Sequence, residues 1–136
     1  MISSKGRYAL RVLVDLAEHQ AGGYISLRDV TARQELSDKY AGQIMSLLSK
    51  AGLVEGVTGK GGGYRLTRAP EQYPLGEVLR LTEGSLAPVA CLGEGAEPCK
   101  RSAQCRTLPV WSRLEQLIGD YLDSVTLADL LQEERE

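Results

Sequence analysis

Residues 36–68 have the sequence LSDKYAGQIMSLLSKAGLVEGVTGKGGGYRLTR, and this stretch decides the fold. Ser37 stands at a helix N-cap position, and Gly52 supplies a left-handed stop. Between them, helical spacing predicts a buried stripe of Tyr40, Ala41, Ile44, Met45 and Leu48. Residues 53–57 and 64–67 are strand-like and are joined by the turn TGKGGG. The stretch therefore predicts a helix followed by a β-hairpin.

The residues before this stretch predict two further helices. Ser26 and Asp29 form an N-cap and an acidic third helical position, so a short helix is expected from Leu27 to about Gln34. An earlier helix, capped by a serine at its start, carries its apolar stripe at Ala9, Val12, Leu13, Leu16 and Ala17. Two short helices joined by the tight connection 34–37, with a hairpin after them, indicate a winged helix-turn-helix.

Beyond the hairpin, the chain predicts three more helices. Residues 75–81 have helical spacing and stop at Gly84. A long helix of about 17 residues follows, with Thr107 as its expected cap and Pro109 in its first turn. Its apolar residues recur in steps of three and four, at Trp111, Leu114, Ile118, Tyr121 and Val125. Residues 126–131 predict a short final helix. A narrow apolar seam on one long helix favours a two-fold partner, so a homodimer is expected with these five residues at its interface.

The expected recognition helix has a polar outer face. In a winged helix this face enters the major groove, and the candidate DNA-binding residues on it are Ser37, Asp38, Lys39, Tyr40 and Gln43. Gln43 can bond both the donor and the acceptor on an adenine edge. The wing adds Lys60, Gly61, Gly62 and Arg65, because glycines allow close approach to a phosphate backbone and the cations supply charge. Double-stranded DNA is therefore the expected partner.

The charge distribution agrees with a polyanionic partner for the first half only. Residues 1–70 carry ten Lys or Arg against six Asp or Glu, whereas residues 71–136 carry six against twelve. The 136-residue chain, 43% hydrophobic and 25% charged, fits a soluble globular protein. Its N-terminal segment has no signal-peptide core, and no stretch reaches the length of a membrane span. We therefore expect a cytoplasmic protein without a membrane partner, and no paired catalytic motif indicates an enzyme.

All three cysteines lie in the stretch CLGEGAEPCKRSAQC, residues 91–105. Cys91, Cys99 and Cys105 are spaced C-x7-C-x5-C, which lacks the paired C-x2-4-C ligands of structural zinc. Soft thiolates select iron-sulfur clusters, zinc or copper(I), and glycines in the loop allow three sulfurs to turn inward. Three thiols without a metal are the alternative. The chain is thus a mainly α fold with a small β-hairpin (α+β), with a winged helix-turn-helix DNA-binding domain at 1–84, a cysteine-rich loop at 85–106, and a dimerisation helix and tail at 107–136.

Several of these stretches together resemble the IscR-type family of dimeric winged-helix regulators. They are SSKGRYALRVLVDLA at the start, residues 36–68, LGEVLRLTEG at 75–84, and three cysteines before a long helix. The resemblance implies a homodimer with crossed long helices, a DNA-binding head on each subunit and an iron-sulfur cluster in the cysteine loop. It also implies a repressor of genes for iron-sulfur cluster biogenesis or iron and sulfur metabolism. A cluster-free repressor that senses thiol redox state or a metabolite is the alternative on the same scaffold.

The chain departs from this family where a fourth cluster ligand is expected. Leu108 stands where the IscR branch has a histidine, and Tyr8 where the nitric-oxide-sensing branch has an aspartate. The fourth cluster ligand is therefore one of several candidates: an outside molecule, or the side chain of Glu94, Glu97 or Thr107. The overall resemblance favours [2Fe-2S], with [4Fe-4S] as the alternative. Cluster binding is expected to order residues 91–106 and to fix residues 75–84 against the long helix.

Overall fold

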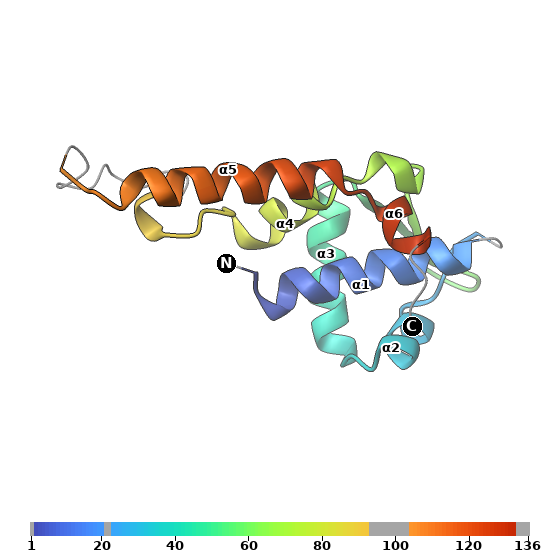
Figure 1. The fold of residues 1–136 in the computed structure, drawn as a ribbon. Helices are drawn as coiled ribbons and strands as arrows, with labels where there is room; N and C mark the ends of the chain where they lie inside the picture. The colour runs from blue at the N-terminus through green and yellow to red at the C-terminus, as the bar shows by residue number, and fades with distance from the viewer. Residues whose placement is uncertain (1, 21–22, 93–103, 133–136) are drawn as a thin grey trace.

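The computed structural model describes residues 2–20, 23–92 and 104–132, and it contains each helix and strand expected from the sequence. The elements are α1 (Ser4–His19), α2 (Leu27–Gln34), α3 (Asp38–Lys50), β1 (Val54–Val57), β2 (Gly63–Leu66), α4 (Leu75–Glu83), α5 (Leu108–Ser124) and α6 (Leu127–Gln132). Two single turns of 3-10 helix, η2 (Pro70–Gln72) and η3 (Ala90–Leu92), lie on either side of α4. The fold is therefore mainly α with one small antiparallel hairpin, as expected (Figure 1).

Each of the first three helices begins with a capping serine. The side chains of Ser3, Ser26 and Ser37 accept hydrogen bonds from the backbone N–H groups of Gly6, Asp29 and Tyr40, at 3.2, 3.2 and 3.1 Å. The same expectation is wrong for Thr107, which precedes α5 but makes no side-chain capping bond. Pro109 in the first turn of α5 has no N–H group, so one of the donors that a cap would satisfy is missing.

The turn between α2 and α3 depends on a left-handed residue that is not glycine. Glu35 has φ 56° and ψ 46°, and its backbone N–H bonds to Thr31 O. Leu36 N donates to the same oxygen at 3.1 Å. Such a backbone is uncommon outside glycine, and no glycine marks the turn in the sequence. The sequence predicts the tight connection but not the residue that makes it.

The core lies where α1, α2, α3 and the hairpin meet. Its fully buried side chains include Val12, Leu13, Leu16, Val30, Ile44, Met45, Leu48 and Tyr73. The predicted stripes on α1 and α3 are confirmed, except that Ala17 and Tyr40 are only half-buried. Removing such apolar side chains from water stabilises the fold by about 1.5–3 kcal/mol each. The unit formed by α1, α2, α3 and the hairpin, called the head below, therefore has a core of its own, to which α5 contributes no buried residue.

Tyr73 fastens the base of the hairpin from inside this core. Its hydroxyl donates to Leu53 O at 2.7 Å and accepts from the N–H groups of Thr67 and Arg68 at 3.0 and 3.1 Å. The ring is fully buried, so these bonds satisfy a polar group that would otherwise destabilise the core. Both ends of the hairpin are thereby held at a fixed position relative to α3.

The hairpin also pairs with the chain before α2. Ile25 and Tyr64 exchange backbone hydrogen bonds of 2.9 and 2.8 Å, which adds an isolated bridge to the four residue pairs of β1 and β2. The sequence indicates Ile25 only as an apolar residue before a cap. This bridge holds the wing against the head.

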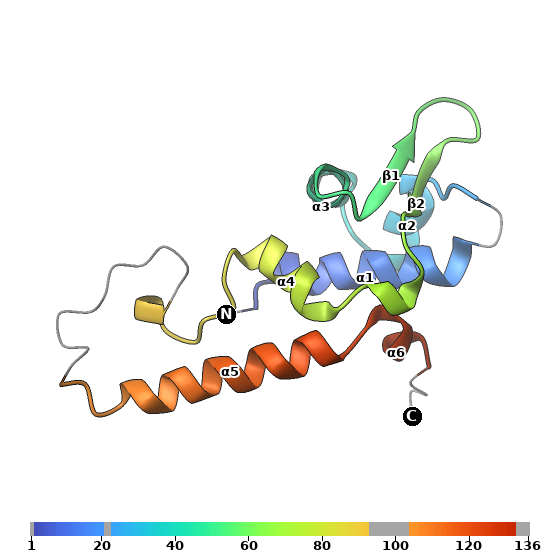
Figure 2. The ribbon, with the colours of Figure 1, turned by 90° about the horizontal axis from the view of Figure 1, so that it is seen from above.

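The long helix α5 lies along one side of the molecule and is joined to the head by α4. α4 contacts both α1 and α5, whereas α5 has no buried residue of its own (Figure 2). The chain then returns to the head: Leu127, the first residue of α6, is fully buried and donates its N–H to Tyr73 O at 2.9 Å. In the described part of the chain, no helix is both long and apolar enough to cross a membrane.

Candidate functional site

The outer face of α3 is open to solvent, with Ser37, Asp38, Lys39 and Gln43 exposed on it. Two of these side chains also support the fold. Ser37 caps the helix, and Asp38 Oδ1 accepts a hydrogen bond from Thr31 Oγ1 at 3.0 Å. Among the described residues, neither Lys39 nor Gln43 has a side-chain hydrogen bond or ion pair. Both are therefore available to an outside ligand.

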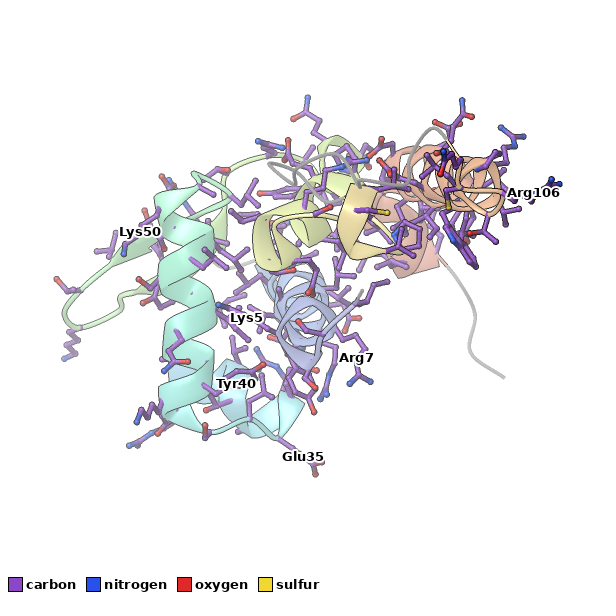
Figure 3. All side chains as sticks on the ribbon, turned by 90° about the vertical axis from the view of Figure 1, so that its left-hand side faces the viewer. Lys5, Arg7, Glu35, Tyr40, Lys50 and Arg106 are labelled. Atoms are coloured by element: carbon purple, nitrogen blue, oxygen red, sulfur yellow. The ribbon has the colours of Figure 1, made fainter. Side chains whose placement is uncertain are left out.

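Tyr40 differs from its neighbours because it is half-buried. Its ring meets the ring of Tyr8 edge-on, with centroids 5.7 Å apart and planes at 87°. The guanidinium of Arg11 lies 4.9 Å from the Tyr8 centroid, and Arg11 Nε donates to Gln34 Oε1 at 3.1 Å. Figure 3 shows Tyr40 at the lower part of α3 in that view, on the side of α1. The contacts give Tyr40 a role in orienting the first turn of α3.

A buried carboxylate ties α1 to α2 behind this face. Asp15 is 1% exposed, and it accepts hydrogen bonds from Arg33 Nε and Nη2 at 2.9 and 2.8 Å and from Gln34 Nε2 at 2.9 Å. Burial alone raises the pKa of Asp15, but the hydrogen bonds from Arg33 and Gln34, with the Arg33 charge, outweigh it and lower the pKa. An acidic residue within the apolar stripe of α1 is the sequence signal for this contact.

On the wing, Arg65 is held by neighbours within the protein. It lies opposite Glu55 in the sheet and pairs with that carboxylate, and its guanidinium lies 4.6 Å from the centroid of the Tyr24 ring. Lys60, at the exposed turn, has no such partner among the described residues. Of the two predicted wing cations, Lys60 is thus the one that can meet a phosphate without giving up an existing ion pair.

Two of the wing glycines are required by the fold itself. A Cβ atom on Gly62 would lie 2.2 Å from Val57 O, and one on Gly63 would lie 2.2 Å from Ile25 O. Gly61 and Gly63 also have positive φ values of 78° and 152°. Gly62 and Gly63 are therefore required by the fold of the wing, whether or not the wing also meets DNA. Gly61 has open space around it and stays exposed at the turn.

The recognition helix and the wing lie on one side of the molecule, away from the start of α5. In Figure 3 the hairpin leaves the Lys50 end of α3 and projects away from α5, whereas Arg106 lies beyond the near end of α5 on the opposite side. Figure 2 shows the same separation from above. A duplex bound by α3 and the wing would lie away from the start of α5.

Two of the three cysteines lie in the described part of the chain. Cys91 is exposed in η3, and Cys105 is half-buried shortly before α5, with its Sγ 3.3 Å from Thr107 Oγ1. Cys99 lies outside the described residues. Among those described, no three His, Cys, Asp or Glu side chains form a group that could hold a metal ion. Accessible thiols outside the core are suitable soft ligands for iron, so this donor chemistry fits a cluster completed by Cys99.

The positions at which the resembling regulators carry a fourth ligand hold other side chains. Leu108 is the first residue of α5, and Tyr8 packs against the recognition helix. His19 lies at the end of α1 with 40% of its side chain exposed, and its Nδ1 is 2.9 Å from Asp15 O. Glu94 and Glu97 lie outside the described residues.

The apolar residues of α5 are largely accessible. Of the predicted seam, Trp111, Leu114, Ile118 and Val125 are half-buried and Tyr121 is 67% exposed. The sequence pattern did not single out Val110 and Leu117, which are 59% and 48% exposed. Together with Leu114 and Tyr121 they follow the spacing of one helix face, and Pro109 and Arg113 extend its groove. This continuous apolar face, in an element without buried residues, is an unusual surface for a single subunit.

One ion pair fixes α5 to α4. Arg80 Nη1 and Nη2 donate to Asp123 Oδ1 and Oδ2 at 2.6 and 3.1 Å, and this contact lowers the pKa of Asp123. Beside the pair, an open cleft of about 650 Å³ lies between the end of α4, residues 84–92 and α5. α5 is therefore connected to α1 through this contact and α4.

Comparisons with known proteins agree with the resemblance found in the sequence. The profile of the Rrf2 family, described as iron-dependent transcriptional regulators, matches residues 2–133. The HTH-type transcriptional regulator IscR of Aliivibrio salmonicida is 38% identical over 130 residues, which cover 96% of this chain and 76% of that protein. The protein of the same name from Erwinia tasmaniensis is also 38% identical over 130 residues, covering 96% and 78%.

Solved structures show the same similarity. CymR, the global cysteine regulator of B. subtilis, has a TM-score of 0.79 and 36% identity, covering 99% of this chain and 98% of that chain. IscR of T. potens has a TM-score of 0.77 and 34% identity, covering 100% and 93%. The winged helix-turn-helix fold and the IscR-type resemblance are thereby confirmed.

Proposed function

This chain belongs to the Rrf2 family of iron-dependent transcriptional regulators, and we propose that it is a homodimeric repressor controlled by an iron-sulfur cluster on Cys91, Cys99 and Cys105. The observation that carries the proposal is the combination of an exposed recognition face on α3 with Cys105 shortly before the distant start of α5. One part would bind DNA and the other would receive the signal. Cluster biogenesis or iron and sulfur metabolism is the proposed target, by similarity to the IscR proteins.

DNA recognition is assigned to α3 and the wing. Gln43 would contact base edges in the major groove, and Lys39 and Lys60 would contact phosphates. Ser37 and Asp38 would hold the start of the helix against the duplex, with Tyr40 orienting that turn. Gly61 and Gly62 would allow the wing to approach the backbone, and Arg65 would contribute only if DNA shares it with Glu55.

Dimerisation is assigned to the apolar face of α5. Two copies of this helix would bury the exposed side chains of Val110, Leu117 and Tyr121, together with the predicted seam. Crossing of the two helices would place one recognition helix on each side of the two-fold axis. Such a pair reads two half-sites of a palindromic operator.

The three cysteine thiolates would hold the cluster, for which [2Fe-2S] is proposed and [4Fe-4S] is the alternative. When bound, the cluster would supply a redox state that responds to oxidants, and the fraction of protein that carries it would respond to iron. The chain's own part would be to bring Cys91 in η3 toward Cys105, shortly before α5. That closure would hold α5 against α4 through Arg80 and Asp123, and α4 in turn contacts α1 of the head.

A direct experiment tests the proposal. The protein is purified without oxygen, iron and sulfide are counted, and absorption and EPR spectra are recorded. Operator binding by the cluster-bound and cluster-free dimers is then compared at one salt concentration, because a ligand shifts an equilibrium only by its different affinity for the two states. Equal amounts of iron and sulfide and unequal operator affinities are expected. Equal affinities on every operator would remove the cluster from the control mechanism.

A second function is favoured by the exposed thiol of Cys91 and by the similarity to CymR, which is described as a global cysteine regulator. In this alternative, oxidation of the cysteines, without iron, would change the DNA affinity. A protein that stays colourless after cluster reconstitution, but loses DNA affinity on mild thiol oxidation, would favour it. Serine substitution of Cys91 would then abolish the redox response without a change in metal content.

A further inference from the structure

Thr107 occupies the N-cap position of α5 without capping the helix. Its φ and ψ are −93° and −16°, and its side chain makes no capping hydrogen bond. The N–H groups of Val110 and Trp111 bond instead to the backbone oxygen of Thr107, at 3.0 and 3.2 Å, and Pro109 has no N–H to satisfy. The start of α5 therefore leaves the Thr107 hydroxyl available for a different partner.

That partner is the sulfur of Cys105, which lies 3.3 Å from Thr107 Oγ1. A thiol can donate or accept in this contact, but a thiolate has no proton. Once Cys105 is a thiolate ligand, only the Thr107 hydroxyl can donate. Metal binding at Cys105 thus fixes the direction of a hydrogen bond whose two atoms already lie together.

We propose that Thr107 is a positioning residue that donates a hydrogen bond to Cys105 Sγ and thereby raises the reduction potential of the cluster held there. The inference rests on the proposed function. Hydrogen bonds to ligating sulfurs withdraw electron density from iron and stabilise the reduced cluster, and partners of metal ligands also fix the ligands' orientation. Thr107 therefore acts through Cys105 and is not the fourth ligand, which another group provides.

The test uses the full chain with Thr107→Val, Thr107→Ala and Thr107→Ser, each reconstituted without oxygen. Dithionite supplies one electron at a time through redox mediators, and absorption and EPR spectra give the midpoint potential of the cluster. We expect valine and alanine to lower the potential by similar amounts, and serine to keep it near the wild-type value. Agreement between valine and alanine attributes the shift to the lost hydroxyl rather than to side-chain volume.

The cluster-free proteins serve as the control for correct folding of the variants. Because the hydroxyl does not cap α5, the helix content and the thermal midpoint of the variants should match those of the wild type. Equal potentials in all four cluster-bound proteins would overturn the role of Thr107 and leave the proposed function intact. Loss of the cluster spectrum with valine and alanine, but not serine, would show that the hydroxyl is needed to hold the cluster rather than to tune its potential, and would also overturn the proposal. A wild-type protein that binds no iron would overturn the proposed function and this inference together.

Discussion

Arg80 on α4 and Asp123 on α5 meet in a two-pronged ion pair that lies directly against Gly76, where there is no room for a Cβ atom without a shift of the pair. A Cβ atom on Gly76 would lie 2.0 Å from Asp123 Oδ1. Gly119, on the facing side of α5, is less constrained, since its Cβ would lie 3.3 Å from Arg80 Nη2 at the end of a flexible side chain. The two glycines differ in what a methyl group would displace, and this difference can be tested.

Gly76→Ala should separate Asp123 from Arg80, whereas Gly119→Ala should leave the pair intact. The pair is about half exposed, so its coupling free energy is expected to be at most about 1 kcal/mol. A double-mutant cycle of Arg80→Ala and Asp123→Ala, measured by urea unfolding, should give no coupling in the Gly76→Ala background. A coupling free energy as large as in the wild-type background would show that Gly76→Ala does not separate Asp123 from Arg80.

Asp15→Asn should destabilise the head by about 2 kcal/mol, because it removes the charge that accepts the Arg33 and Gln34 hydrogen bonds in a buried site. The pKa of Asp15 is lowered in the folded state. Its stabilising contribution is therefore complete above the unfolded pKa of about 3.9 and is lost as pH falls through the folded pKa. Urea unfolding at pH 7 and at successively lower pH should show the difference from wild type shrinking only below about pH 4. A difference that stays constant into that acid range would contradict this account.

Gly63→Ala should destabilise the wing, because its Cβ would collide with the backbone oxygen of Ile25 and its φ is positive. A loss of at least about 2 kcal/mol in unfolding free energy is expected from the clash and the strain. Gly42→Ala, in the middle of α3 with open space around it, is the matched control and should stabilise the helix by up to about 1 kcal/mol. Thermal unfolding of the Gly63→Ala and Gly42→Ala proteins measures the two changes in stability. Equal effects would mean that Ile25 does not restrict the wing.

Gln43→Ala and Lys39→Ala should affect DNA binding in different ways. Loss of Gln43 should cost about 1–3 kcal/mol on the preferred operator and relax its sequence preference. Loss of Lys39 should weaken binding to every sequence and reduce the salt slope by about 1. Both are measured by fluorescence anisotropy over a range of salt, on duplexes selected from a random library. If Gln43→Ala weakened specific and non-specific duplexes equally, α3 would not be reading bases through that residue.

Leu117→Glu should give a monomer, because it places a charge in the apolar face of α5 that is proposed to pair with a second copy. Gln116→Glu adds the same charge one residue away, on the side that borders the cleft with α4, and should stay dimeric. Sedimentation equilibrium distinguishes the two states. A dimeric Leu117→Glu protein would place the subunit interface elsewhere.

Most of the secondary structure could be predicted because its signals are local. Ser26 and Ser37 cap helices through backbone groups three residues away, and the apolar spacing of α1 and α3 follows from the helical repeat. Thr107 shows where local reasoning fails. A residue with capping chemistry makes no cap here: Pro109, two residues on, has no N–H to offer it, and its hydroxyl lies beside a cysteine sulfur instead.

The candidate DNA face was predicted in part. Lys39 and Gln43 could be placed on an exposed face from spacing alone. The pairing of Arg65 with Glu55 depends on the register of the hairpin, and the role of Tyr40 depends on a contact with α1. Neither can be derived from one segment, since each joins parts of the chain that the fold brings together.

The sequence by itself determined the order and the approximate bounds of the helices, the hairpin, the cysteine spacing and the family. These depend on short-range periodicity, capping and motif spacing. Only the tertiary structure decided that Asp15 is a buried partner of Arg33, that Gly63 is required by Ile25, and that α5 is docked through Arg80. The physical reason is that each of these interactions joins residues far apart in the chain, and close packing determines which of the possible partners meet.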